Sequence, residues 1–144
     1  MLLRTQMMKQ CKHPFIPDSP GVSRFFVPSI VNLRKENKLF LLCLSSGDAD
    51  GLGRTREKEL EKSCAFLGFA EVPTVIDDPD LQDGMDKKWG VDLVAEQITR
   101  YLTAKMKLGK DSEIDIIVSF DEHGISSHPN HIAVNAGVCK VIRD

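Results

Sequence analysis

Short apolar runs alternate along the chain with amphipathic stretches. The runs at 38–46, 72–78 and 113–120 lack polar alternation, which is typical of strands buried on both faces of a parallel sheet. Residues 54–69 and 91–107 instead place their apolar positions on one helical face. Because strands and helices alternate, the pattern predicts an α/β fold, with a Rossmann-like, mostly parallel sheet flanked by helices.

The two amphipathic stretches carry the faces and ends expected of helices. The first follows the i, i+4, i+7 spacing of a buried face, made of Leu60, Cys64 and Leu67. Gly68 then supplies a stop signal. The apolar positions of the second include Leu93, Ile98 and Leu102. Further helices are expected across 23–37, where Pro28 is an obstacle, and from a start near Pro129.

Length and composition fit a single ordinary globular domain. The chain has 144 residues, so we treat 1–144 as one domain and 1–22 as its divergent or irregular start. A net charge of −2 argues against a nucleic-acid partner. No apolar run reaches the roughly 18 residues of a transmembrane helix. The cysteines form no CxxC pair and are interpreted as reduced, mostly buried thiols of a cytosol-facing protein: Cys11, Cys43, Cys64 and Cys139.

Ionisable residues gather where the predicted strands end. The three loops at these ends read SSGDADG, DDPDLQDG and DEHGISSHPNH. Ligands of open α/β sheets bind at the carboxyl ends of the strands, so these loops form the candidate site. The first loop is glycine-rich, as phosphate-binding loops are, but it lacks the Lys-Ser/Thr pair of a P-loop. A nucleotide or phosphosugar site in that loop is the weaker interpretation.

The last loop holds two histidines three residues apart, His128 and His131, behind a predicted strand that ends near Asp121. A neutral imidazole binds zinc through one ring nitrogen, and a nearby carboxylate commonly orients the ring. His131 is therefore a candidate metal ligand, and Asp121 a candidate acceptor that orients one of the two rings. The alternative is a polar loop whose histidines only cap the following helix. The spacing alone leaves both interpretations open.

Five segments together resemble the N-acetylglucosaminyl-phosphatidylinositol de-N-acetylase family, the eukaryotic branch of the LmbE-like zinc deacetylases. They read FFVPSIVNL, FLLCLSSGDADGLGRTREKEL, EKSCAFLGF, VIDDPDLQDGMDKKW and VSFDEHGISSHPNHIAV. The resemblance runs from about Ser23 to the end of the chain. It implies an LmbE-like fold and removal of the acetyl group from N-acetylglucosaminyl-phosphatidylinositol, an early step of GPI-anchor assembly.

The resemblance also implies roles for individual residues. His131 would bind zinc or another divalent metal, and His128 would polarise the acetyl carbonyl and stabilise the oxyanion. Arg56, at the start of the helix after the glycine loop, would contact the substrate. The implied location is the cytosolic face of the endoplasmic reticulum membrane. The implied partners are the glycolipid substrate and the membrane surface.

The family's first motif, His-Pro-Asp-Asp-Glu, is altered in this chain. His13 and Pro14 match it, but Phe15 and Ile16 stand where the two aspartates belong. Counting back from FFVPSI without a gap reaches Asp18, so matching His13 requires an insertion of five residues. Asp18 is then the nearest carboxylate and the candidate catalytic base. The implied metal ligands are His13, Asp18 and His131.

Alternatives follow from this altered motif. The chain is either an active deacetylase, with Asp48 or Asp50 as a substitute base, or a catalytically impaired homologue that binds a partner. An unrelated α/β binding module is the third possibility. Family members usually continue with further sheet and helix, whereas 13 residues follow His131, so we expect a truncated or divergent copy of the domain.

Overall fold

Four parallel strands form the centre of the fold. The computed structural model describes residues 14–18, 25–107 and 114–144. Its strands are β1 (Pro14–Asp18), β2 (Phe40–Cys43), β3 (Thr74–Val75) and β4 (Ile116–Ile117). They form one sheet in the order β3-β2-β1-β4, and every pairing is parallel. The predicted α/β class with a parallel sheet is confirmed.

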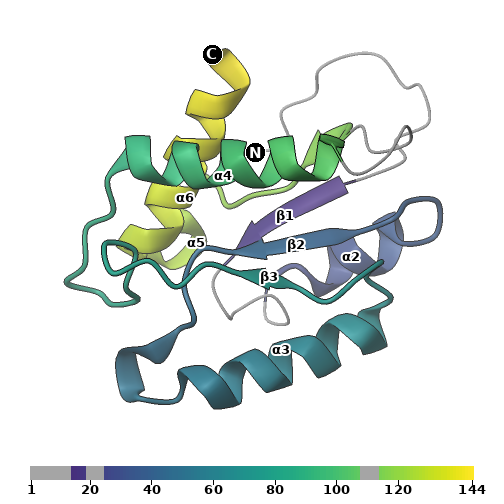
Figure 1. The fold of residues 1–144 in the computed structure, drawn as a ribbon, viewed down its shortest axis with the longest axis horizontal. Helices are drawn as coiled ribbons and strands as arrows, with labels where there is room; N and C mark the ends of the chain where they lie inside the picture. Colours follow the sequence, from purple (N-terminus) through teal and green to yellow (C-terminus); the bar gives the residue numbers. More distant parts are fainter. Residues whose placement is uncertain (1–13, 19–24, 108–113) are drawn as a thin grey trace.

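Helices cover both faces of the sheet (Figure 1). On one face lie α2 (Val27–Leu33) and α3 (Gly53–Leu67). On the other, α4 (Val91–Lys107) and α6 (Pro129–Arg143) pack against each other. Two short elements stand in loops: η1 (Asp48–Asp50) and α5 (Gly124–Ser127).

The strand order reverses next to β1, and this reversal defines where a ligand can bind. From β1 the chain moves through α2 to β2 and through α3 to β3, in one direction along the sheet. Helix α4 then returns the chain to β4, on the far side of β1. Helix α2, which follows β1, and α6, which follows β4, lie on opposite faces of the sheet. In open α/β sheets such a switch in strand order marks the crevice, at the carboxyl ends of the two strands, where ligands bind.

The helices begin and end close to where the sequence pattern predicted. Helix α2 starts at Val27, so Pro28 lies in its first turn, where a missing N–H costs no intrahelical hydrogen bond. Gly68 caps α3 in a left-handed conformation with φ 78°. On α4 the buried stripe differs from the expected one. Ile98 is fully buried as expected, but Leu93 and Leu102 are only partly buried, and the other buried members are Val94, Ala95, Gln97 and Tyr101.

The N-terminal region corrects the sequence interpretation. Residues 1–22 were expected to be divergent or irregular, yet Pro14–Asp18 form β1, which lies between β2 and β4. The register pairs Phe15 with Phe40 on one side and with Ile117 on the other. Proline is uncommon inside a central strand because it lacks a backbone N–H, so Pro14 and Pro17 hid this strand from the pattern.

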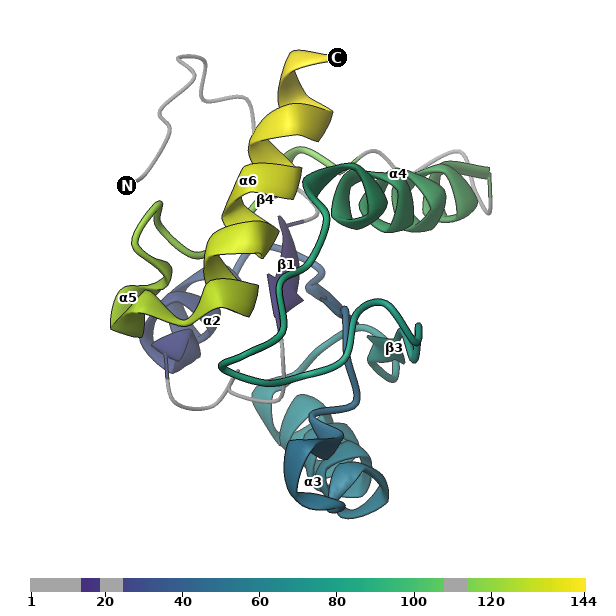
Figure 2. The ribbon, with the colours of Figure 1, turned by 90° about the vertical axis from the view of Figure 1, so that its left-hand side faces the viewer.

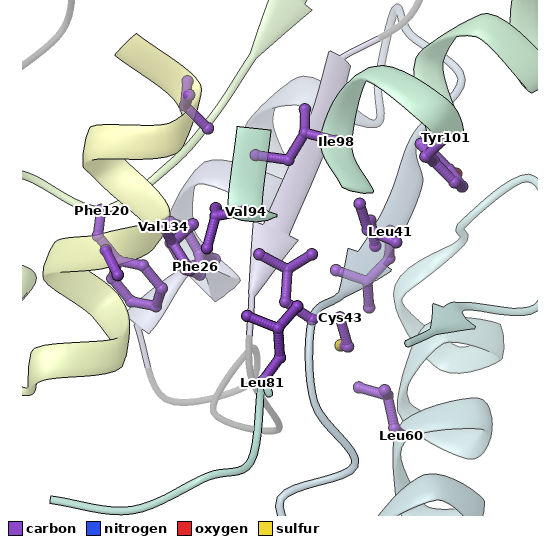
Figure 3. Close-up of a cluster of buried hydrophobic side chains, with 14 of the residues drawn as sticks. Phe26, Leu41, Cys43, Leu60, Leu81, Val94, Ile98, Tyr101, Phe120 and Val134 are labelled. Carbon is purple, nitrogen blue, oxygen red and sulfur yellow. The ribbon is translucent and has the colours of Figure 1, made fainter. Parts of the chain in front are cut away.

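The hydrophobic core lies between the sheet and its two helical layers. Figure 3 shows Leu41 and Cys43 of β2 among side chains from α3, α4 and α6. The core contains two buried cysteines, Cys43 and Cys64, and burial raises the pKa of the Cys64 thiol to about 11. Cys139 is half-buried, whereas Cys11 lies outside the described residues. Within the described ranges, none of the helices is long and apolar enough to span a bilayer.

Candidate functional site

Three loops meet at the carboxyl edge of the sheet, the edge that faces the viewer in Figure 2. Residues 44–52 follow β2, residues 76–90 follow β3, and residues 118–128 follow β4. These are the polar loops that the sequence analysis singled out. The parallel strand direction brings them to one side of the molecule, next to the crevice beside β1.

His131 lies in the first turn of α6 and is packed between two rings. Its imidazole stacks on Phe120 with ring centroids 4.0 Å apart and on His128 at 4.6 Å. Phe25 approaches edge-on at 6.1 Å, and only 7% of the residue is exposed. Burial lowers the pKa of His131 below its usual value, with the hydrogen bond to Gly124 acting in the opposite direction. The neutral imidazole, which is the metal-binding form, is therefore favoured.

The hydrogen bonds of the two histidines assign them opposite tautomers. Nδ1 of His131 lies 3.1 Å from the carbonyl oxygen of Gly124, which can only accept, so Nδ1 carries the proton and Nε2 the lone pair. Nδ1 of His128 instead accepts the backbone N–H of Asn130 at 3.3 Å. In the neutral ring the proton then resides on Nε2. One ring offers a ligand nitrogen, and its stacked neighbour offers a hydrogen-bond donor.

His128 is also the N-cap of α6, as the alternative interpretation of the histidine pair expected. The cap uses only Nδ1, through the bond to Asn130. Nε2 lies on the opposite side of the ring and faces the loop that follows β3. Capping and chemistry therefore use different nitrogens, and the first role does not exclude the second.

A left-handed turn presents the Gly124 carbonyl to His131. Gly124 and Ile125 have φ values of 59° and 63°, and a positive φ is costly for a β-branched side chain such as isoleucine. The Asp121 carboxylate holds this turn, because its Oδ1 accepts the backbone N–H of His123 at 3.1 Å and of Ile125 at 3.0 Å. The N–H of Ile125 is the main reason that the pKa of Asp121 is lowered.

The expected role of Asp121, orienting one of the two imidazoles, stays a prediction. Its Oδ1 accepts two backbone N–H groups of the turn that precedes α6. Asp121 supports this backbone turn, and the Gly124 carbonyl oxygen of the turn contacts Nδ1 of His131. The sequence placed a carboxylate near the histidines correctly, but the geometry of the turn decides which atoms it can reach.

Asp83 is the site residue that the sequence analysis did not single out. Its Oδ1 lies 4.0 Å from Nε2 of His128, and its Oδ2 lies 3.9 Å from Nη1 of Arg56. Its side chain is 16% exposed. The loop after β3 also contains Asp77, Asp78, Asp80 and Asp86, so the sequence offers no means of choosing among them. Only the folded loop sets Asp83 between the imidazole and the guanidinium.

Arg56 is partly buried rather than free in solvent. Its Nη1 donates to the carbonyl oxygen of Gly47 at 2.7 Å, and its Nη2 pairs with Asp50 at 2.9 Å. About 30% of its side chain is exposed. Arg56 thus fastens the glycine loop while one edge of its guanidinium faces Asp83 in the site.

The glycine loop itself carries carboxylates where a phosphate-binding loop would present N–H groups. Asp48 accepts the backbone N–H of Gly53 at 2.6 Å at the start of α3, and Asp50 pairs with Arg56. Both aspartates that were considered as substitute bases are therefore engaged within their own loop. A bound phosphate would face their negative charge, which disfavours the nucleotide or phosphosugar interpretation.

Asp18 ends β1, in register with Cys43 at the end of β2. Its backbone therefore stands at the carboxyl edge, beside the crevice. Pro14 begins the same strand, roughly 13 Å away at 3.3 Å per residue. His13 lies outside the described residues. The gap-free count, which reaches Asp18, agrees with the place of the strand end.

The described residues offer part of a metal site. Among them, no group of three or more His, Cys, Asp or Glu side chains is arranged to hold an ion. The lone pair on Nε2 of His131 suits one zinc coordination position. Asp18 ends β1 at the same edge of the sheet. Imidazole nitrogen and carboxylate oxygen both suit zinc. Of the expected ligands, His131 is the one whose side chain the structure describes.

Comparison with known proteins connects this geometry to a family. The sequence profile described as GlcNAc-PI de-N-acetylase matches residues 23–142. A probable N-acetylglucosaminyl-phosphatidylinositol de-N-acetylase from Dictyostelium discoideum is 39% identical over 122 residues, covering 83% of this chain and 45% of that protein. The Bos taurus N-acetylglucosaminyl-phosphatidylinositol de-N-acetylase is 38% identical over 124 residues, covering 85% and 46%.

A solved structure supports the fold. The N,N'-diacetylchitobiose deacetylase of Pyrococcus horikoshii, complexed with its inhibitor MPG, aligns with a TM-score of 0.68 over 92% of this chain and 49% of that chain, at 16% identity. The chain spans less than half the length of these relatives. The resemblance read from the sequence motifs is confirmed, and the chain belongs to the GlcNAc-PI de-N-acetylase family.

Proposed function

We propose that the chain carries the histidine side of a zinc-dependent amide hydrolase that removes the acetyl group from N-acetylglucosaminyl-phosphatidylinositol in GPI-anchor biosynthesis. The observation that carries this proposal is the pair of stacked imidazoles with opposite tautomers, His131 and His128. The names of the relatives supply the substrate. A metal ligand beside a donor is the arrangement that hydrolysis of an acetamide requires.

His131 is the proposed metal ligand, together with Asp18 at the carboxyl end of β1. If these residues hold zinc, the metal would supply polarisation of the acetyl carbonyl and a lower pKa for water. His131 contributes through Nε2, because the Gly124 carbonyl holds the proton on Nδ1. The rings of Phe120 and His128 keep the imidazole from rotating and exclude water from its faces.

His128 is the proposed donor to the oxyanion. Its Nε2–H faces the site, because Nδ1 is occupied by the N–H of Asn130. A donor placed where negative charge develops typically contributes about 10²–10³-fold in kcat. The Oδ1 atom of Asp83 lies 4.0 Å from this nitrogen, so a carboxylate faces the donor. Arg56 and Asp83 together form the proposed contact surface for the hydroxyl groups of the substrate.

The catalytic base is the part of the site where this chain departs from its family. Asp18 is the carboxylate at the end of β1, and a carboxylate bound to zinc is a poor base because the metal withdraws its electron density. This single carboxylate favours the second candidate function, a catalytically impaired homologue that binds metal and glycolipid. Metal content and turnover measured on the same protein separate the two.

We propose that the protein acts at a membrane surface, on the cytosolic face of the endoplasmic reticulum. Eight large hydrophobic side chains are exposed in the described part of the chain, and five of them lie at the carboxyl edge around the site. We call these five the apolar rim: Leu52, Met85, Val91, Ile125 and Ile132. A rim of this kind suits a site whose substrate is held in a bilayer, because apolar side chains can enter the interfacial region.

The test compares two alanine variants of the full chain. His131→Ala should lose most bound zinc, because the remaining ligands hold the ion poorly. His128→Ala should retain zinc and, where the wild-type chain hydrolyses the glycolipid, lose roughly 10²–10³-fold in kcat. Zinc is measured by elemental analysis after gel filtration, and turnover by release of acetate.

Two results would contradict the assignment. Unchanged zinc content in His131→Ala would exclude that residue as a ligand. Equal zinc loss in His128→Ala would show that both rings bind metal. Zinc binding without hydrolysis in the wild-type chain would favour the impaired homologue.

A further inference from the structure

The loop after β3, residues 76–89, is here called the acidic loop, and its second half is held by hydrogen bonds at two points. Nε1 of Trp89 donates to the carbonyl oxygen of Gln82 at 2.8 Å, which closes the loop on itself. The second tie comes from α6, 46 residues away in sequence. Asp83 lies inside this closed segment, facing Arg56 and His128.

Asn130 makes the tie from α6. Its Oδ1 accepts the backbone N–H of Gly84 at 3.1 Å, and its Nδ2 donates to the carbonyl oxygen of Lys87 at 3.0 Å. The side chain is completely buried. One donor and one acceptor on the loop fix the orientation of the amide, because exchanging its oxygen and nitrogen would set like groups against each other.

The backbone of Asn130 serves the histidine as well. Its N–H donates to Nδ1 of His128 at 3.3 Å, the bond that places the His128 proton on Nε2. The same residue therefore sets the tautomer of His128 and holds the loop that carries Asp83 opposite that nitrogen.

We infer that Asn130 is a positioning residue, whose side-chain amide holds the acidic loop so that Asp83 faces Arg56 and His128. This inference rests on the proposed function only for its effect on turnover. The placement of the loop is a separate claim about the folded chain.

The chemistry of the amide explains why this position carries asparagine. An apolar side chain would leave the Gly84 N–H and the Lys87 carbonyl without the partners that they have now. An ionised aspartate can accept from Gly84 but cannot donate to Lys87, and it sets a negative oxygen against a carbonyl. Aspartate has nearly the same shape as asparagine, so Asn130→Asp tests the hydrogen bond with little change in packing.

The loop itself can be followed without any enzymatic assay. Trp89 is the single tryptophan of the chain, so its fluorescence reports on the acidic loop alone. In Asn130→Asp we expect acrylamide to quench Trp89 fluorescence more strongly. We also expect amide hydrogen exchange at Gly84 to be at least about tenfold faster, while exchange at Ile98 in α4 stays the same. The smaller Asn130→Ser serves if the aspartate variant does not fold.

The matched control is Asn135→Asp. Asn135 lies on the same helix and donates its amide to the carbonyl oxygen of Phe120 at 2.7 Å, so it does not contact the acidic loop. We expect normal Trp89 quenching and normal Gly84 exchange in this variant. An acidic loop that is equally protected in wild type, Asn130→Asp and Asn130→Ser would overturn the inference.

Turnover tests whether the effect passes through Asp83. With N-acetylglucosaminyl-phosphatidylinositol in detergent micelles, Asn130→Asp should lower kcat/KM about tenfold to hundredfold, as a misplaced contact does. In an Asp83→Asn background the same change should cost little, because the group that it positions is already lost. Independent, multiplying losses would show that Asn130 acts elsewhere.

The two proposals fail in different ways. If the wild-type chain does not hydrolyse the glycolipid, the proposed function fails, and the fluorescence and exchange measurements still decide the placement of the loop. If hydrolysis is normal in Asn130→Asp, the positioning role fails while the proposed function stands.

Discussion

At the scale of single residues, the protonation of His131 has the clearest measurable consequence. Burial lowers its pKa in the folded chain below the usual value of about 6.5. The unfolded chain therefore takes up a proton at a higher pH than the folded chain. The free energy of unfolding is then complete above about pH 6.5 and decreases as the pH falls from that value toward the folded pKa.

The expected result is a decrease in the free energy of unfolding as the pH falls below about 6.5, and a smaller decrease in His131→Gln, which cannot titrate. Urea unfolding at each pH, with chelator present to remove metal, measures it. Asp121, whose pKa is also lowered, contributes only at more acidic pH, because carboxylates ordinarily titrate near 4. Identical pH dependence in the two proteins would exclude His131 as its source.

At the scale of elements, the close contact between α4 and α6 depends on Gly137. A β-carbon added there would lie 2.3 Å from Cγ1 of Val94 and 2.9 Å from its Cβ. Alanine favours a helix by about 1 kcal/mol over glycine, but the clash at Val94 outweighs this preference. We expect Gly137→Ala to lower the free energy of unfolding by ~1–3 kcal/mol in urea titrations.

Two further variants make this prediction specific to the contact. Gly90 precedes α4 and has nothing within 4 Å of its added β-carbon, so Gly90→Ala should stay within about 0.5 kcal/mol of wild type. Val94→Ala in the Gly137→Ala background removes the clashing methyl groups and should recover part of the loss. A Gly137→Ala protein as stable as wild type would mean that the helices separate without cost.

At the scale of the whole molecule, the apolar rim predicts how the chain meets a bilayer. We expect the triple change Leu52→Ser, Met85→Gln and Ile125→Asn to reduce sedimentation with phospholipid vesicles at least about tenfold, since each buried CH₂ contributes ~0.8 kcal/mol. Exposed carboxylates such as Asp50 and Asp86 share this edge, so binding should depend only weakly on salt.

The control uses the exposed apolar side chains away from that edge. Phe66→Gln, Val72→Thr and Ile142→Gln remove comparable apolar surface elsewhere and should leave vesicle binding unchanged. An equal loss in both triple variants would show that general hydrophobicity, rather than the rim, determines binding.

The sequence by itself determined the elements whose residues interact locally or through a simple period. The apolar runs and helical faces predicted β2, α3, α4 and α6, because burial on one face imposes a repeat that can be counted. The motif segments also identified the family, and they singled out His128 and His131. Each of these signals lies within a stretch of consecutive residues.

The tertiary structure decided what depends on distant partners. β1 is a strand because β2 and β4 supply its hydrogen bonds, although its own prolines argue against one. Asp83 faces His128 from a loop whose Gly84 N–H donates to Asn130, 46 residues further along the chain. The tautomer of His131 depends on the Gly124 carbonyl, which the left-handed turn presents. Such bonds join groups that no periodicity relates, so only the folded chain brings them together.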